Sequence, residues 1–170
     1  WISENPWVDA SRIGLSGHSY GGFMTCYALT HSKLFAAGIA GAPVTDWRDY
    51  DSVYTERYML TPAENPEGYD KTSAVKAAKD IHGRLLLLHG MIDDNVHPQN
   101  STRLIRALQR ADKDFELMLY PEARHGIGGK HYNPYFPGGL ISMPFQLTPD
   151  RVTYDDGTKA TSTQMAKDVV

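Results

Sequence analysis

The chain has 170 residues, of which 41% are hydrophobic and 22% are charged, proportions that are ordinary for one globular domain. Its 17 Lys and Arg against 20 Asp and Glu give a net charge of -3, which argues against a protein that binds nucleic acid or anionic membranes through charge. The single cysteine, Cys26, excludes an internal disulfide, a cysteine-rich zinc site and the two-cysteine attachment of a c-type haem. No apolar run approaches the roughly 20 residues that a transmembrane helix needs.

Strands and helices are predicted to alternate from the start of the chain. Residues 12–17 are apolar and end in glycine, which favours a buried strand followed by a sharp turn. The apolar side chains of residues 20–30, which include a glycine pair, predict a helix that packs closely on a sheet. Residues 35–44 are small and apolar and predict a second strand. The aromatic-rich residues 46–59 are predicted to be helical.

The same alternation continues beyond a loop, which two prolines and a glycine predict for residues 61–69. Four leucines at residues 85–88 show no alternation, which is typical of a strand covered on both faces. Residues 99–110 have a helical period, and residues 115–120 predict a last strand that Pro121 ends. The order predicts an α/β fold with a mainly parallel sheet, in which ligand sites lie at the carboxyl ends of the strands.

A G-x-S-x-G motif with Ser19 at its centre follows the first predicted strand. This pattern is typical of a nucleophile elbow, a strained turn between a strand and a helix that holds a serine hydroxyl above a sheet. Gly17 and Gly21 are expected to permit the turn because neither brings a Cβ atom against the neighbouring backbone. The helix that follows would bring its unpaired N–H groups close to any negative charge that develops there.

Two acids and two histidines follow the leucine run: His89, Asp93, Asp94 and His97. An acid at the end of a later strand is the expected third member of a hydrolase triad, and the pattern alone does not choose between Asp93 and Asp94. The four side chains could also bind a metal, but their spacing is irregular and no further Cys or His motif completes a closed site. The two histidines are therefore expected to be packed or hydrogen-bonded.

His125 lies in a short loop just beyond the last predicted strand, where a general base is expected. The order serine, acid, histidine is that of the α/β-hydrolase triad. A serine hydroxyl is a weak nucleophile until a base takes its proton, and an imidazole titrates near neutrality and can do so. A buried carboxylate would fix the tautomer of the imidazole and stabilise the imidazolium.

Four segments together resemble the prolyl oligopeptidase family, and most closely its dipeptidyl peptidase IV branch: GHSYGG, APVTDWRDYDSVYTERYM, LLLLHGMIDDNVH and YPEARHG. The resemblance covers residues 1–129 and implies a partial α/β-hydrolase fold, the C-terminal half of a mainly parallel sheet. It implies that Ser19 is the nucleophile, Asp93 the triad acid and His125 the base. The N–H of Tyr20 would be one donor of the oxyanion hole.

The resemblance also assigns an aromatic pocket for the residue before the cleaved bond. Its counterparts here are Tyr20, Val44, Trp47, Tyr50, Tyr54 and Val96. Tyr50 and Tyr54 are four apart, so on a helix they would share a face, and a flat apolar pocket suits a proline ring. From the residues alone, these aromatic side chains would be interpreted as ordinary core. Asn95 matches a family residue that holds a substrate carbonyl.

Two features depart from the family. Trp stands in many members where this chain has His18. The chain opens at Trp1 without an initiator Met, and we expect it to be a piece of a longer protein. The family's early strands, an upstream oxyanion-hole tyrosine and a β-propeller with a substrate-binding glutamate pair are not among the matching residues. The family is compatible with a homodimer, and the sequence does not decide between a periplasmic and a cytoplasmic location.

Residues 130–170 do not resemble this family and are expected to be poorly packed. From residue 132 onward they resemble the c-type cytochrome subunit of the respiratory bc complex. The resemblance implies that Met143 matches an axial haem ligand. Because the cysteines that attach the haem and the opposite histidine ligand are missing, we expect an orphaned ligand and a seam near residues 129–131.

The sequence therefore predicts a serine peptidase that cleaves peptides after proline or alanine through an acyl-enzyme. It predicts a peptide as substrate, no metal or other cofactor, no nucleic acid partner and no membrane segment. A carboxylic-ester hydrolase is an alternative, because the same triad serves both reactions. A catalytically inert fragment or chimera is a second alternative, because half of the sheet and one oxyanion donor are not in the chain.

Overall fold

The computed structural model describes residues 4–127, 130–132 and 140–142. The chain divides into two compact units, residues 1–127 and residues 128–170, and each is described by itself.

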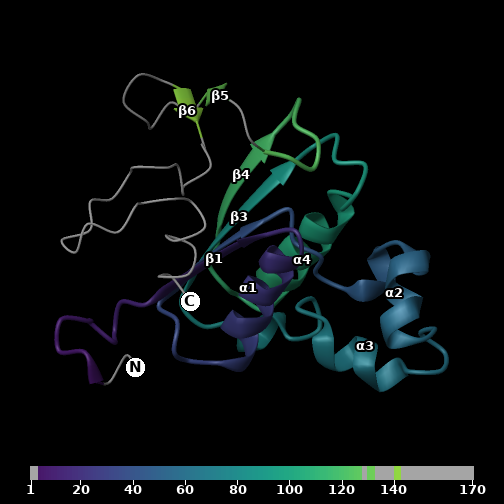
Figure 1. The fold of residues 1–170 in the computed structure, drawn as a ribbon, viewed down its shortest axis with the longest axis horizontal. Helices are drawn as coiled ribbons and strands as arrows, with labels where there is room; N and C mark the ends of the chain where they lie inside the picture. The colour runs from purple at the N-terminus through teal and green to yellow at the C-terminus, as the bar shows by residue number, and fades with distance from the viewer. Residues whose placement is uncertain (1–3, 128–129, 133–139, 143–170) are drawn as a thin grey trace, which may run out of the picture. The chain divides into compact units, whose positions relative to one another are not determined.

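The first unit is built on a four-stranded parallel sheet (Figure 1). Its strands are β1 (Gly14–His18), β2 (Ala37–Gly41), β3 (Arg84–Gly90) and β4 (Glu116–Tyr120), and they lie in the sheet in the order of the chain. Each of the first three strands is followed by a crossover that returns the chain to the same end of the sheet, as parallel pairing requires. The predicted α/β fold with a mainly parallel sheet is confirmed.

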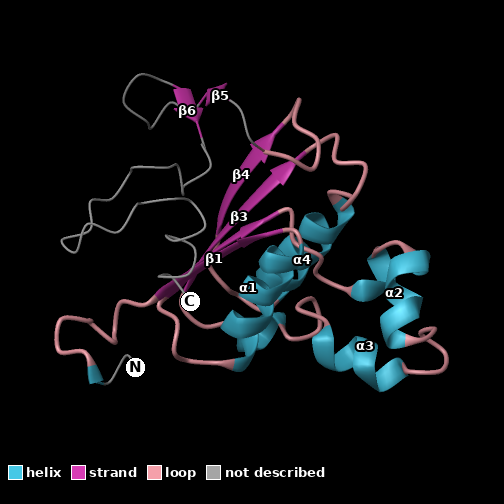
Figure 2. Cartoon of the chain, viewed as in Figure 1, coloured by secondary structure: helices cyan, strands magenta, loops and turns pink. Residues whose placement is uncertain are grey.

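The helices of the first unit connect these strands (Figure 2). They are α1 (Tyr20–His31), α2 (Ser52–Met59), α3 (Pro66–Thr72) and α4 (Gln99–Arg110), with short 3-10 turns η2 (Trp47–Asp49) and η3 (Ala78–Asp80). The helices predicted over residues 20–30 and 99–110 are confirmed. Among the described residues, no helix combines the length and the apolar character needed to cross a membrane.

Two predictions on the middle of the chain are wrong. Residues 46–59 do not form one helix, because the 3-10 turn ends at Asp49 with an extended Tyr50 after it. Asp51 then starts α2 as its cap, by accepting a hydrogen bond from the N–H of Tyr54. Residues 66–69 are helical, although they were expected in a loop. The side chain of Asn65 caps α3, and Pro66 occupies its first turn, where a missing N–H costs nothing.

The main core lies between the sheet and helices α1 and α4. Leu29, Leu85, Leu87, Leu104 and Leu108 are all buried there in one cluster. Leu88 is buried in a separate cluster with Tyr120 and Ile127. Truncating one of these leucines to alanine typically destabilises a protein by about 2–5 kcal/mol. This packing fixes the helices on the sheet and holds the carboxyl ends of the strands in place.

The second unit contains a short antiparallel strand pair, β5 (Lys130–Tyr132) with β6 (Leu140–Ser142), in which His131 is opposite Ile141. Met143, singled out above as a counterpart of a haem ligand, lies outside the described residues, as do residues 144–170.

Candidate active site

The carboxyl ends of β1, β3 and β4 bring Ser19, Asp93 and His125 together. Because the strands are parallel, the segments that follow them emerge at one edge of the sheet. Ser19 follows β1, Asp93 follows β3, and His125 lies in the loop after β4. The three side chains come from distant parts of the sequence, and the sheet alone makes them neighbours.

Ser19 occupies a strained turn between β1 and α1. Its φ of 61° and ψ of -118° place a non-glycine residue in a region that L-residues rarely adopt. The N–H of Ser19 donates a hydrogen bond of 2.8 Å to the carbonyl of Gly41, which anchors the turn on β2. This geometry is that of a nucleophile elbow.

The two glycines of the motif have different roles. A Cβ atom on Gly17 would overlap the backbone of Gly21, so this position requires glycine. A Cβ atom on Gly21 would meet nothing within 4 Å. The expectation that the turn has no room for a Cβ atom at either glycine is therefore confirmed at Gly17 and wrong at Gly21.

A continuous hydrogen-bonded chain joins Ser19 to Asp93 through His125. The Nδ1 of His125 lies 2.8 Å from Oδ2 of Asp93, and its Nε2 lies 2.8 Å from the Oγ of Ser19. A carboxylate only accepts hydrogen bonds, so Nδ1 carries the proton and Nε2 is left as the acceptor for the serine hydroxyl. The half-buried imidazole is thereby oriented to take the proton of Ser19.

Asp93 is held as a buried carboxylate. Only 2% of the residue is exposed, and its Oδ1 accepts hydrogen bonds of 3.0 Å from the N–H groups of Asn95 and Val96. Asp94, the other acid that the pattern left open, is exposed and pairs with Arg124. The geometry therefore places Asp93, and not Asp94, beside the imidazole of His125.

His89 is a buried hydrogen-bonded side chain, as predicted. Its Nδ1 lies 2.7 Å from the hydroxyl of Ser101, and its Nε2 lies 2.8 Å from the carbonyl oxygen of Val96. Burial is the main cause that lowers the pKa of His89, so the ring is neutral at neutral pH. His97 is exposed. In the part of the chain that the structure describes, no three His, Cys, Asp or Glu side chains are grouped so that they could hold a metal ion.

Tyr20 begins helix α1, so its N–H belongs to the first turn, where backbone donors have no partner inside the helix. Its side chain is more than half exposed and lies against Trp47, with 5.9 Å between the ring centroids. The residue therefore contributes its N–H next to Ser19 and its ring to an aromatic cluster.

Trp47 is the centre of that aromatic cluster. Its ring contacts those of Tyr20, Phe23, Tyr50 and Tyr54 at centroid distances between 5.0 and 6.1 Å. Tyr50 and Tyr54 do meet, at 5.5 Å, but they do not share a helix face as predicted, because Tyr50 precedes α2. The contact arises where the 3-10 turn joins the helix.

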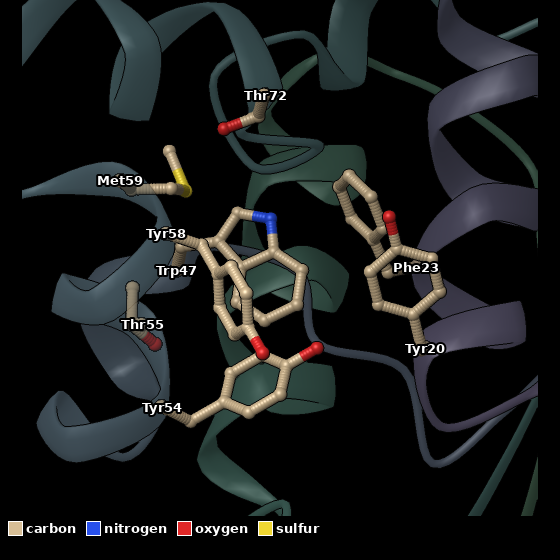
Figure 3. A pocket seen from close by; sticks show the side chains of 8 residues that line it. All are labelled: Tyr20, Phe23, Trp47, Tyr54, Thr55, Tyr58, Met59 and Thr72. Atoms are coloured by element: carbon tan, nitrogen blue, oxygen red, sulfur yellow. The ribbon is translucent and has the colours of Figure 1, made fainter.

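A cavity of about 450 Å³ opens beside this cluster (Figure 3). It is lined by Tyr20, Phe23, Trp47, Tyr54, Thr55, Tyr58, Met59 and Thr72. Of the predicted pocket residues, three line it, whereas Val44 and Val96 are buried in the same hydrophobic cluster as Trp47 without lining it. Sequence reasoning found Tyr54 on α2 but missed the other lining residues Phe23, Thr55, Tyr58, Met59 and Thr72, although Tyr54 and Tyr58 are spaced four apart.

Tyr50 and Asn95 line a second cavity of about 590 Å³, to which Tyr54 also contributes. The hydroxyl of Tyr50 donates a hydrogen bond of 2.8 Å to Oδ1 of Asn95. Burial raises the pKa of Tyr50, and the neighbouring Tyr54 and Asp51 raise it further, so the hydroxyl keeps its proton and remains a donor. This bond leaves the Nδ2 hydrogens of Asn95 to face another acceptor.

Known proteins resemble the chain in both sequence and fold. It is 46% identical over 129 residues to a probable dipeptidyl-aminopeptidase B of Neurospora crassa and 50% identical over 129 residues to that of Emericella nidulans. Each match covers 74% of this chain and 14% of the relative, so the chain spans a small part of their length. The Porphyromonas gingivalis dipeptidyl peptidase 4 structure matches with a TM-score of 0.73 and 49% identity, over 75% of this chain and 18% of that one.

Two family models match the chain. Residues 106–170 match the cytochrome C1 family, which supports the resemblance seen in the tail, and the match begins within α4. Residues 1–136 match the prolyl oligopeptidase family, and this match includes the whole parallel sheet and the three strand ends. The chain therefore belongs to the prolyl oligopeptidase family.

Proposed function

We propose that this chain carries the catalytic groups of a serine peptidase that removes dipeptides from the amino terminus of peptides, cutting after proline or alanine. The single observation that carries the proposal is the hydrogen-bonded chain from Ser19 through His125 to Asp93, with 2.8 Å at each step. Dipeptidyl aminopeptidase relatives at 46–50% identity supply the substrate class. The catalytic part is proposed to be residues 1–129, with residues 130–170 as a separate segment.

The reaction proceeds through an acyl-enzyme. Nε2 of His125 takes the hydroxyl proton as the Oγ of Ser19 attacks the peptide carbonyl carbon. The imidazolium then gives that proton to the leaving amine, and the C–N bond breaks. Water next attacks the ester, with His125 again accepting and returning a proton, which frees Ser19 and releases the dipeptide. Asp93 keeps its negative charge throughout and stabilises the imidazolium.

The oxyanion that forms on the substrate is stabilised by the N–H of Tyr20 at the start of α1. The positive end of the helix dipole adds to this interaction. Removal of one such donor typically raises the barrier by about 3–4 kcal/mol. The strained turn at Ser19 aims the nucleophile and this donor at the same carbonyl group.

The aromatic cluster serves as the pocket for the residue before the cleaved bond. The flat walls for a proline ring are the side chains of Tyr20, Trp47 and Tyr54. Tyr20 directly follows Ser19 in the sequence, which brings this pocket next to the nucleophile. Val44 and Val96 support this wall from the buried side, in the cluster that also contains Trp47. A rigid ring loses little conformational entropy on binding, so such a pocket favours proline over a flexible side chain of similar size.

Asn95 holds the carbonyl of the residue preceding the proline. Its Oδ1 is occupied by the hydroxyl of Tyr50, so the amide nitrogen is directed to the substrate.

An active-site label tests the proposed nucleophile. In the full-length protein, a fluorophosphonate probe should form a covalent bond with Ser19, and Ser19→Ala should abolish labelling. Ser16→Ala, which changes an exposed serine on β1, is the matched control and should label like the wild type. Labelling that persists in Ser19→Ala would overturn the assignment.

The substrate class is tested with three compounds built on the same dipeptide. The p-nitroanilide of Gly-Pro should be hydrolysed, the same compound with an acetylated amino terminus should be hydrolysed poorly, and Ser19→Ala should hydrolyse neither. Hydrolysis confined to the p-nitrophenyl ester of the same dipeptide would replace the peptidase with a carboxylic-ester hydrolase.

A further inference from the structure

We propose that His18 is a positioning residue for proton transfer, which holds the imidazole of His125 in place with its ring and blocks the reaction when it is itself protonated. This inference rests on the proposed function, since it assigns a role in the proton transfer between Ser19 and His125. It concerns a side chain that takes no part in the hydrogen-bonded chain.

The ring of His18 lies against that of His125. Their centroids are 4.8 Å apart and their planes are tilted by 54°. His125 is therefore restrained on three sides, by Asp93 at Nδ1, by Ser19 at Nε2 and by the His18 ring. The hydrogen bonds at Nδ1 and Nε2 still allow the imidazole ring to rotate about the axis through these two atoms. The His18 ring, which packs against it, limits this rotation.

Gly41 on the neighbouring strand makes room for the His18 ring. His18 pairs with Gly41 in the register of β1 and β2. A Cβ atom on Gly41 would lie 3.1 Å from Cδ2 of His18, which is closer than ordinary van der Waals contact, and 3.4 Å from Cδ1 of Ile127, which is the lower edge of ordinary contact. The position of the His18 ring therefore depends on a glycine at this point of the sheet.

The environment of His18 keeps its ring neutral near neutral pH. The His18 residue is exposed by surface area, but partial desolvation of its ring against the sheet edge is the first cause that lowers its pKa, and the nearby His125 and His89 act in the same direction. The Asp93 carboxylate and the backbone of His125 act in the opposite direction and are weaker than the sum of these effects. A neutral ring is compatible with a neighbour that must become an imidazolium, whereas a protonated His18 would repel it.

This arrangement predicts two protonations that stop the reaction on the acid side. A proton on Nε2 of His125 removes the acceptor for the serine hydroxyl, and a proton on His18 opposes the imidazolium that the reaction must form. Below the lowered pKa of His18, the kcat/KM of the wild type should fall about 100-fold per pH unit, and a variant with one such group should fall about tenfold.

The first experiment compares His18→Phe with His18→Ala in the full-length protein. His18→Phe keeps a flat ring that cannot be protonated. It should retain kcat within about threefold at pH 8. At the most acid pH values, its kcat/KM should fall about tenfold per pH unit, where that of the wild type falls about 100-fold. His18→Ala removes the ring, and it should lower kcat about tenfold at pH 8 with little change in KM, because the imidazole is less restrained.

A double-mutant cycle tests the geometry independently. Gly41→Ala should lower kcat, because the added methyl group presses on the His18 ring and disturbs its contact with the His125 ring. In the His18→Ala background the same change has no ring to displace and should have little further effect. The coupling between the two sites separates this mechanism from a general loss of stability, which would be additive.

The outcomes separate this inference from the proposed function. If Ser19→Ala hydrolyses Gly-Pro p-nitroanilide as fast as the wild type, both proposals fail. If hydrolysis depends on Ser19, but His18→Ala and His18→Phe match the wild type at every pH, only the role of His18 is overturned. Additive losses in the double-mutant cycle would also contradict it.

Discussion

The strand ends and the aromatic pocket position their side chains by different means. At the strand ends, Ser19 and His125 are 106 residues apart in sequence and are joined by a hydrogen bond of 2.8 Å. In the aromatic cluster beside the pocket, Trp47, Tyr50 and Tyr54 lie within one short stretch and touch through ring faces and edges, at centroid distances of 5.5 to 6.1 Å. The first site is assembled from distant segments by the register of the sheet, whereas these three rings are already neighbours in sequence.

This difference predicts how each site responds to substitution. In the proposed mechanism, His125 can take the proton of Ser19 only if each hydrogen-bonding atom has the right chemistry, so one changed atom should cost orders of magnitude in rate. Ring packing is non-directional and roughly proportional to the area buried, so a changed atom in the pocket should cost about 1 kcal/mol or less of binding or stability.

The largest effect is expected at Asp93. Asp93→Asn should lower kcat about 10,000-fold, because an amide nitrogen can face Nδ1 of His125 and favour the wrong tautomer. Asp94→Asn is the matched control, and it should remain within about threefold of the wild type, since its exposed pair with Arg124 lies outside the chain of proton transfer. Steady-state kinetics with Gly-Pro p-nitroanilide measures both. Equal losses in the two variants would contradict the assignment of the acid.

A smaller but still large effect is expected from the backbone that carries Ser19. Gly17→Ala should lower the free energy of unfolding by about 3 kcal/mol or more, because a methyl group would overlap the backbone of Gly21, which no rotamer can move aside. Gly21→Ala places the same group in open space at the start of α1 and should cost nothing. Denaturant unfolding of the two variants compares them directly, and a stable Gly17→Ala protein would show that the turn is less constrained than its geometry indicates.

The strand ends were largely predictable from sequence. The apolar run at residues 85–88 and the glycine motif around Ser19 mark strands and turns through local composition, and parallel order then brings their carboxyl ends together. The choice between Asp93 and Asp94 was not predictable from the pattern. Neighbouring residues in a turn point in different directions, and no periodicity encodes which one faces the imidazole. The resemblance favoured Asp93, and the hydrogen bonds place that residue beside His125.

The pocket was predicted only in part. Sequence reasoning selected Tyr20, Trp47 and Tyr54 through a family resemblance, but it missed Phe23 and the α2 residues that complete the cavity. Which helix faces meet depends on the angle between α1 and α2, and that angle is set by tertiary packing and not by local sequence. The side-chain cap that starts α3 at Asn65 was missed because prolines on both sides suggested a loop.

The smallest effect is expected at Thr55 in the wall of the pocket. Among the described residues, its hydroxyl oxygen is the buried side-chain polar atom for which the structure provides no hydrogen-bond partner. Thr55→Val keeps the shape and removes this unsatisfied group, so the free energy of unfolding should rise by about 1 kcal/mol. Thr45→Val is the matched control: its equally buried hydroxyl donates 2.7 Å to the carbonyl of Asn100, and its loss should destabilise the protein by about 1 kcal/mol. Denaturant unfolding should therefore show that the free energy of unfolding rises in Thr55→Val and falls in Thr45→Val. A loss of stability in both variants would mean that the Thr55 hydroxyl has a hydrogen-bond partner in solution.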